Sequence, residues 1–317
     1  MDFTRYDQTI QELYRRQKSY LQMADPKVIS VIRKLLKHAR DLRDEELTGY
    51  AYHSLSFAEY FITGRYDAFL KYARLAAEHL FRCEDRSELM HVYYLVGIDA
   101  HNKGLHDIAY HLFLTARNIA EETGQTTSAA ILDEDIGHIL LLIGDYKEAR
   151  VYLKNSLRIV RRDASHPHYY NNVTSCFMND AEACLRLGLI REAKKDYEKT
   201  RQFMEKHPNA FQPDARINFA LLGVKIAVAD QDSALVRTRF EALLERIGQI
   251  PQIGIYINDL RQLTDLLIRA GEVSLAGRLV KALEKKPIAD DAAEPQRLLL
   301  EAKLAYFTAT GQRKALM

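Results

Sequence analysis

The sequence is poor in the features of disulfide-stabilised and membrane-spanning proteins. It has only three cysteines, Cys83, Cys176 and Cys184, and none forms a Cys-x-x-Cys pair. This sparse, odd number argues against a disulfide framework or a zinc site and fits a reducing cytoplasm. The chain also lacks the run of about 18 apolar residues that a transmembrane helix needs. Its N-terminal segment has no apolar signal-peptide core.

Net charge and catalytic motifs are scarce as well. Lysine and arginine number 45 and aspartate and glutamate 43, which leaves a net charge of +2. Because the two signs are mixed along the chain, we expect no field that would gather nucleic acid. The sequence has no phosphate loop, dinucleotide fingerprint or nucleophile elbow. We therefore expect no catalytic residue, metal or cofactor, and no nucleic-acid or membrane partner.

The sequence does contain a turn residue that recurs at a nearly constant interval. The intervals are 40, 40, 44, 42, 41 and 40 residues, and the positions are Gly64, Gly104, Gly144, Gly188, Asp230, Gly271 and Gly311. Each position stands between two apolar helical runs. A self-similar period of this size predicts a solenoid of helix pairs, which is a binding surface and not an enzyme core.

The second repeat illustrates the pattern. Its first helix is expected at about 89–103, and Gly104 ends it. The second helix, from about 106, places small and aromatic side chains on one face: Ala109, Phe113 and Ala116. Glycine within a helix costs about 1 kcal/mol relative to alanine, so it needs a packing reason. We expect burial against a neighbouring helix for three such glycines: Gly97, Gly137 and Gly223.

This order of small residue, turn glycine, aromatic and alanine resembles the tetratricopeptide repeat (TPR). The resemblance covers about residues 50–317, and repeats two to four match best, as in Gly144, Tyr146 and Ala149. It departs from the motif in its longer period and in the absence of tryptophan. HEAT-like repeats, whose period is closer, are the alternative. The resemblance implies an all-α fold, namely a right-handed TPR-like superhelical solenoid of helix-turn-helix repeats with a period of about 40 residues.

The two ends of the chain differ from the repeats. Residues 1–49 lack the repeat glycines, and we interpret them as an N-terminal cap with helices at about 3–22 and 27–43. Residues 50–317 then hold about six and a half repeats, which suggests truncation before an output domain. On the last helix we expect an exposed apolar stripe that mediates a homodimer. The stripe consists of Leu298, Leu299, Ala302, Tyr306 and Phe307.

The resemblance also implies which residues line the concave groove, because first helices line it in TPR arrays. The residues at the inward positions are Tyr94, His101, Asn102, Glu134, His138, Asn179, Glu182, Arg186, Arg261 and Asp265. Such side chains hold peptide backbones and carboxylates. The alternative is that they form ordinary solvated helix faces. Lys147 and Arg150 are expected on the convex face, with little part in binding.

Two charged clusters have simple structural interpretations. The basic residues of segment 27–43 could face an acidic partner or a membrane, but an exposed face of an amphipathic cap helix explains them. The acidic run Asp133, Glu134 and Asp135 is expected at the start of a helix, where the helix dipole stabilises carboxylates.

These observations predict a non-catalytic interaction or sensor domain that binds a peptide, a protein or a small ligand in its groove. Long-period arrays of this kind resemble the N-terminal sensory region of bacterial signalling proteins such as GGDEF diguanylate cyclases. That resemblance implies a cytoplasmic protein that regulates a C-terminal output domain. A stand-alone scaffold for the assembly of protein complexes is the alternative.

Overall fold

The computed structural model describes residues 1–23, 25–63, 65–84, 86–166, 169–211, 213–249, 256–286 and 293–311. These residues form fifteen α-helices and no strand. They divide into two compact units. Unit 1 comprises Met1–Asp145 with Arg158–Val160, and unit 2 comprises Tyr146–Leu157 with Arg161–Met317.

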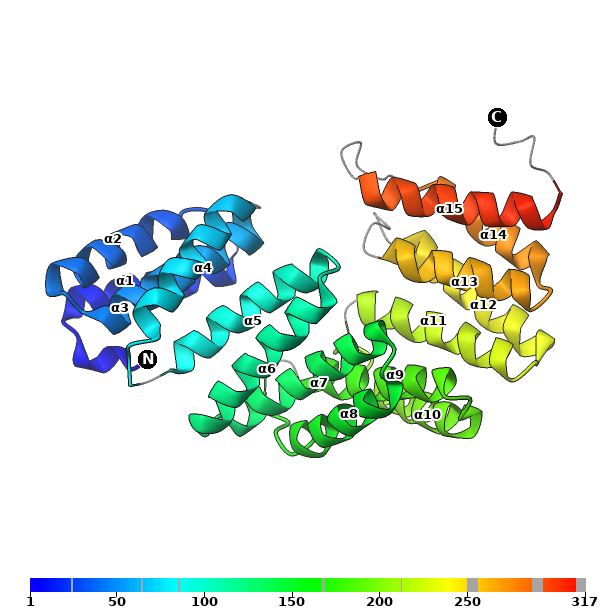
Figure 1. The fold of residues 1–317 in the computed structure, drawn as a ribbon, viewed down its shortest axis with the longest axis horizontal. Coiled ribbons are helices and arrows are strands. Elements are labelled where there is room, and N and C mark those ends of the chain that lie inside the picture. Colours follow the sequence, from blue (N-terminus) through cyan, green and yellow to red (C-terminus); the bar gives the residue numbers. More distant parts are fainter. Residues whose placement is uncertain are drawn as a thin grey trace. The chain divides into compact units, whose positions relative to one another are not determined.

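Unit 1 is a stack of short-linked helices (Figure 1). Its elements are η1 (Phe3–Arg5), α1 (Gln8–Gln22), α2 (Val28–Leu42), α3 (Glu45–Ala58), the π-helical turn η2 (Glu59–Thr63), α4 (Tyr66–Leu80), α5 (Ser87–Asn102), α6 (His106–Glu122) and α7 (Thr126–Ile143). Helices α3 and α4 pack as one pair, and α5 and α6 as the next. The expected cap helices correspond to α1 and α2, and the proposed boundary at residue 49 lies within α3.

Local sequence explains features of the first three helices. The side chains of Asp7 and Asp44 precede α1 and α3 and accept hydrogen bonds from the backbone amides of Ile10 (2.9 Å) and Leu47 (2.8 Å). Helix α2 buries one apolar face, and its basic residues, such as Lys34 and Lys37, are exposed. The amphipathic interpretation of this segment is therefore confirmed.

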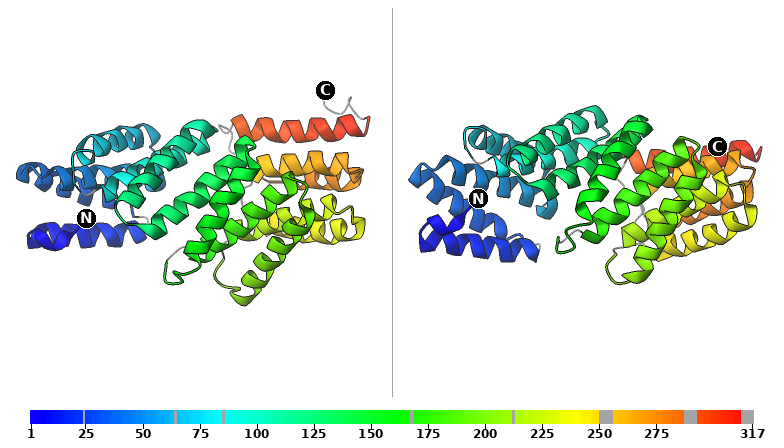
Figure 2. Two further views of the ribbon diagram at one scale, coloured as in Figure 1. Left: turned by 60° about the horizontal axis from the view of Figure 1, so that its bottom comes forward. Right: turned by 90° about the horizontal axis from the view of Figure 1, so that it is seen from below.

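Unit 2 contains eight helices among its described residues: α8 (Tyr146–Val160, mostly in this unit), α9 (Tyr169–Arg186), α10 (Ile190–Lys206), α11 (Pro213–Ala229), α12 (Ser233–Gln249), α13 (Ile257–Arg269), α14 (Val273–Glu284) and α15 (Ala293–Ala309). The first helices of the pairs neighbour one another, α9 with α11, α11 with α13 and α13 with α15. Figure 2 shows these pairs from two further sides. Their shared core includes Phe240, Leu243 and Leu263.

The predicted turn positions end helices, and most are left-handed glycines. The φ angles are 73° at Gly104, 94° at Gly144, 74° at Gly188, 80° at Gly271 and 72° at Gly311. At the first of these turns, the amide of Leu105 donates to the carbonyl of Ala100 at 2.9 Å, which closes a Schellman-type cap. Gly64 lies outside the described residues. The helix-pair period is thus confirmed at these five glycines.

The turn after α11 departs from the prediction in one residue. We expected Asp230 to replace the turn glycine, but the left-handed residue is Gln231, with φ of 58°. The amide of Asp232 donates to the carbonyl of Ala227 at 3.2 Å, the same cap bond as at the glycine turns. Gln231 therefore occupies the glycine position, and Asp230 precedes it.

The three mid-helix glycines are buried, as predicted, and two of them lie at close helix contacts. A Cβ on Gly97 would lie 2.6 Å from Cε1 of Phe113, and one on Gly223 would lie 2.7 Å from the hydroxyl of Tyr197. Gly137 is also buried. Only a residue without a side chain leaves room for these contacts.

The last helix contradicts the expected exposed stripe. Leu298 and Ala302 are buried, and Leu299 and Tyr306 pack against the core of unit 2. Helix α15 lies against both α13 and α14, so most of the stripe is covered by the chain's own repeats, and Phe307 is half-buried. The exposed apolar residues of α15 are instead Leu300 and Leu304. A homodimer through that stripe is therefore not supported.

The structure confirms the predicted fold class, an all-α solenoid of helix pairs. Among the described residues, no helix has the length and hydropathy that crossing a membrane would require.

Candidate functional site

The predicted groove residues fall into two groups, one in each unit. Tyr94, His101, Asn102, Glu134 and His138 belong to unit 1, and Asn179, Glu182, Arg186, Arg261 and Asp265 belong to unit 2. Each group is carried by first helices, α5 and α7 in unit 1 and α9 and α13 in unit 2.

In unit 2, polar side chains link three first helices into a surface that we name the α9–α13 wall, formed by Asn179, Glu182, Arg186, Lys225, Arg261, Gln262 and Asp265. Glu182 on α9 accepts from Arg186 Nε at 3.0 Å and from Lys225 Nζ on α11 at 3.2 Å. Arg186 Nη2 also donates to Gln262 Oε1 on α13 at 3.4 Å. Side chains of α9 and α13 therefore meet across α11, which lies between them.

The charges of the wall are mixed and only partly buried. Burial raises the pKa of Glu182, but the positive charges of Lys225 and Arg186 outweigh it and hold that pKa below its ordinary value. Arg186 remains 46% exposed despite its contacts. An exposed guanidinium next to a fixed carboxylate offers donors to one ligand group and an acceptor to another.

The wall continues on α13. Arg261 Nη1 donates to Asp265 at 3.0 Å, and its Nε lies 3.7 Å from Glu301 on α15. The buried Nε atom of Arg261 has no hydrogen-bond partner among the described residues. Asn179 stands one turn before Glu182 on α9 and is half-buried. The predicted residues of unit 2 thus lie on one continuous layer of helices.

In unit 1, three histidines gather where α5, α6 and α7 meet. The ring of His101 lies 5.6 Å from that of His106 and 5.4 Å from that of His138. Burial lowers the pKa of His101 to about 4, and repulsion from His138 and His106 adds to the effect. His101 is therefore neutral near pH 7. Sequence reasoning included His101 and His138 but missed His106, which belongs to a second helix.

The remaining predicted residues of unit 1 also have specific neighbours. Asn102 donates to the hydroxyl of Tyr60 at 2.6 Å. The nearby carboxyl of Asp135, burial and Glu134 together raise the pKa of Tyr94 far above its ordinary value. Asp135 was expected only as part of the acidic run and not as a groove residue, and burial together with Glu134 raises the pKa of its carboxyl.

The acidic run 133–135 corrects one expectation. Helix α7 begins at Thr126, so these residues lie in its middle and do not cap its start. Asp133 is buried and accepts a hydrogen bond from Arg117 Nε on α6. Asp133 of this run thus joins α6 to α7 through its ion pair with Arg117.

A second buried group in unit 2 resembles a metal site in composition only. Ligand atoms of Asp180, Cys184 and Asp196 lie within 4.8 Å of one another. However, Arg150 Nε donates to Asp180 at 2.7 Å, and Lys199 Nζ donates to Asp196 at 2.6 Å. Burial, helped by Asp180, raises the pKa of Cys184 to about 11, so its thiol stays protonated. We interpret the group as an ion-pair network.

The same network includes Arg150, which we expected on the convex face with Lys147 and with little part in binding. Lys147 is exposed, but Arg150 is only 18% exposed and holds Asp180. The reason is the packing of α8 against α9, which turns this position of α8 toward a buried carboxylate.

The comparisons with known proteins agree on the fold. No family model and no curated protein matches the chain. Among solved structures, the apo form of RapI aligns with a TM-score of 0.64 at 16% identity, covering 94% of this chain and 99% of RapI. BtubC (BKLC) from P. vanneervenii aligns with a TM-score of 0.57 at 15% identity over 74% and 91% of the two chains. PilW, a type IV pilus biogenesis factor, aligns with a TM-score of 0.55 at 19% identity, covering 77% of this chain and 96% of PilW.

These alignments and the helix-pair geometry define the fold of the chain as a TPR-like α-solenoid. At such identities the likeness extends to the fold alone.

Proposed function

We propose that this chain is a non-catalytic binding module that takes an extended peptide on the α9–α13 wall. The observation that carries the proposal is the linkage of Glu182, Arg186 and Gln262 across three helices. An extended peptide presents backbone donors and acceptors at regular intervals, together with charged side chains. A wall with amide, carboxylate and guanidinium groups in one layer can pair with both.

The proposal includes a regulatory role. Binding of a peptide would be the input of a signalling protein, with an output domain of the diguanylate cyclase kind by analogy. Repeat arrays support such a role because ligand contacts spread over several repeats and thereby stiffen them together. The alternative is a scaffold that holds a folded protein partner, which would need a larger surface than one peptide covers.

Selection of a displayed random heptapeptide library on the purified chain tests the proposal. Selected peptides are labelled with fluorescein, and their affinities are measured by fluorescence anisotropy. The double variant Asn179→Ala with Arg186→Ala should bind at least about tenfold more weakly, since each lost contact is worth about 1–3 kcal/mol.

The matched control is Lys147→Ala with Lys195→Ala, because both residues are exposed on second helices of the same unit. Its affinity should equal that of the unchanged chain. Equal affinity of both double variants, with intact circular dichroism spectra, would show that the peptide binds away from the wall. Recovery of no binding peptide would favour the scaffold alternative.

A further inference from the structure

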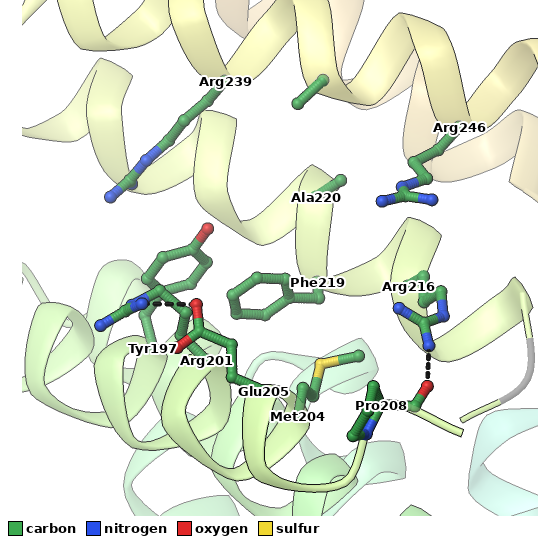
Figure 3. Close-up of a pocket in the computed structure, with 11 residues that line it drawn as sticks. Tyr197, Arg201, Met204, Glu205, Pro208, Arg216, Phe219, Ala220, Arg239 and Arg246 are labelled. Carbon is green, nitrogen blue, oxygen red and sulfur yellow. Dashed lines mark hydrogen bonds and ion pairs between the residues drawn. The ribbon is translucent and has the colours of Figure 1, made fainter. Parts of the chain in front are cut away.

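A pocket in unit 2 lies away from the α9–α13 wall and is lined by α10, α11 and α12 (Figure 3). Its volume is about 430 Å³, within the range of about 300–1,000 Å³ of ligand pockets. Helices α10 and α12 both pack on α11, and the pocket opens between them. None of the wall residues lines it.

The floor of the pocket is aromatic and fixed. The rings of Tyr197 on α10 and Phe219 on α11 stack with centroids 4.3 Å apart and planes at 6°. The hydroxyl of Tyr197 lies over the position where a Cβ of Gly223 would be. Gly223 therefore lets the tyrosine lie against the backbone of α11. Met204 and Ala220 extend the apolar surface.

Arginines surround this floor. Arg239 on α12 stacks over the ring of Tyr197 at 4.5 Å and donates to the carbonyl of Gly223 at 2.8 Å. Arg216 donates to the carbonyl of Pro208, and Arg246 donates to Gln249 at 3.3 Å. Figure 3 shows Arg239 on one side of Phe219, with Arg216 and Arg246 on the other.

These three guanidinium groups form no ion pair with a carboxylate among the described residues, although the charge of Arg239 contributes to the lowered pKa of Glu198. Each is half-buried and donates to a neutral acceptor. Elsewhere in unit 2, arginines such as Arg186, Arg261 and Arg278 pair with carboxylates. A half-buried guanidinium with only neutral partners retains unused capacity for a charge-assisted bond to an anion.

We propose that this pocket binds an acidic peptide segment of a partner protein. An apolar side chain of the segment rests on Phe219, one flanking carboxylate pairs with Arg239, and another pairs with Arg216 and Arg246. The separated cations and the apolar floor match discrete carboxylates on either side of an apolar residue. Arg201, which also lines the pocket, is already paired with Glu198 and Glu205. The remaining arginines form two separate cationic positions, which match two separate carboxylates better than a continuous row of phosphates.

The proposal goes beyond the proposed function, since it assigns a second site with different residues. The probes are two fluorescein-labelled peptides, Glu-Glu-Phe-Glu-Glu and Glu-Glu-Leu-Glu-Glu, with Gln-Gln-Phe-Gln-Gln as the neutral comparison. Fluorescence anisotropy at low salt should give a Kd below about 1 mM for at least one acidic peptide and at least tenfold weaker binding of the neutral one.

Two variants test the site. Arg216→Gln with Arg246→Gln should weaken binding of the acidic peptide at least tenfold. Ala242→Trp, at an exposed lining position, should also weaken it by filling the pocket while leaving every arginine in place. The matched control is Arg191→Gln with Arg237→Gln, which removes two exposed charges from α10 and α12 outside the pocket and should change little.

Several results would overturn the proposal. These are no binding of either acidic peptide, an equal loss in the control pair, or no effect of Ala242→Trp. Binding of single-stranded poly(U) that depends on the same arginines, without competition by the acidic peptides, would assign the pocket to nucleic acid instead. The wall variant with Asn179→Ala and Arg186→Ala should keep full binding of the acidic peptides, so failure at one site is distinguishable from failure at the other.

Discussion

At the scale of single residues, the glycines of this chain have two separate roles. Gly104 and Gly188 supply a left-handed turn with open space around them. Gly97 and Gly223 instead leave room for an aromatic ring from another helix. The sequence predicted burial of the second kind, because glycine within a helix needs a packing reason. It could not reveal that the partner of Gly223 is Tyr197 of the preceding repeat, since that contact depends on how successive pairs stack.

The contact of Gly97 with Phe113 gives the first prediction. Gly97→Ala should lower the free energy of unfolding by about 1–3 kcal/mol, because the new Cβ would meet a buried ring. This cost exceeds the gain in helix propensity of about 1 kcal/mol. In a Phe113→Leu background the same change should cost less. Urea unfolding followed by circular dichroism measures both, and an equal cost in the two backgrounds would contradict the contact.

His101 gives a prediction for pH dependence. Burial, with His138 and His106, lowers its pKa from 6.5 to about 4, so between these values the unfolded chain binds more protons than the folded one. Stability should therefore fall as the pH is lowered through this window, with His101 contributing about 1–2 kcal/mol once solvent screening at this partly exposed ring is allowed for. His101→Asn should flatten the dependence, and His111→Asn, an exposed position of α6, should not. Melting temperatures from pH 7 to pH 4 decide the matter.

At the scale of elements, α9 serves two surfaces. Glu182 and Arg186 stand four residues apart and face the wall, and the sequence placed both correctly on one helix face. Its other side carries Asp180 against Arg150 of α8. That pair could not be predicted, because the rotation of α8 about its axis is set by packing and not by its own residues. Lys225 and Gln262 were also not predicted, because they belong to helices whose sequences match the repeat pattern only weakly.

The Arg150–Asp180 pair gives the prediction at this scale. Arg150→Met should cost about 2–4 kcal/mol, because it leaves a largely buried carboxyl without its cation. Adding Asp180→Asn should recover part of this loss, since the uncompensated charge is removed. Lys147→Met, an exposed position on the same helix, serves as the control and should cost little. A loss in thermal stability as large for Lys147→Met as for Arg150→Met would refute the importance of the pair.

At the scale of the whole molecule, the chain consists of helix pairs that contact mainly their neighbours. The interval between turn residues predicted this architecture, because the positions of the turns depend only on local sequence. The division into two compact units was not predicted, since it depends on how tightly neighbouring pairs pack and no linker composition marks it. The Arg216–Arg239–Arg246 pocket also escaped prediction, because its residues come from three helices without a common spacing.

This architecture predicts local effects of mutation. In a stack with nearest-neighbour contacts, a destabilised pair opens without opening distant pairs. Gly97→Ala should therefore speed hydrogen exchange in peptides from α5 and α6 and leave those from α13 and α14 nearly unchanged. Mass spectrometry of exchanged peptides measures this. Uniform acceleration across the whole chain would indicate a single cooperative unit.

The turn after α11 shows how a repeat can lose its turn glycine and keep its fold. Gln231 adopts the left-handed angle of the glycines and keeps the same cap bond, at a conformational cost of about 1 kcal/mol. That penalty is small enough for the turn glycine, the most typical residue of a repeat, to be substituted while the fold persists. Sequence similarity between repeats falls with each such substitution, whereas the backbone conformation is kept. A chain with such turns can thus lose the sequence marks of its repeats and keep its backbone fold.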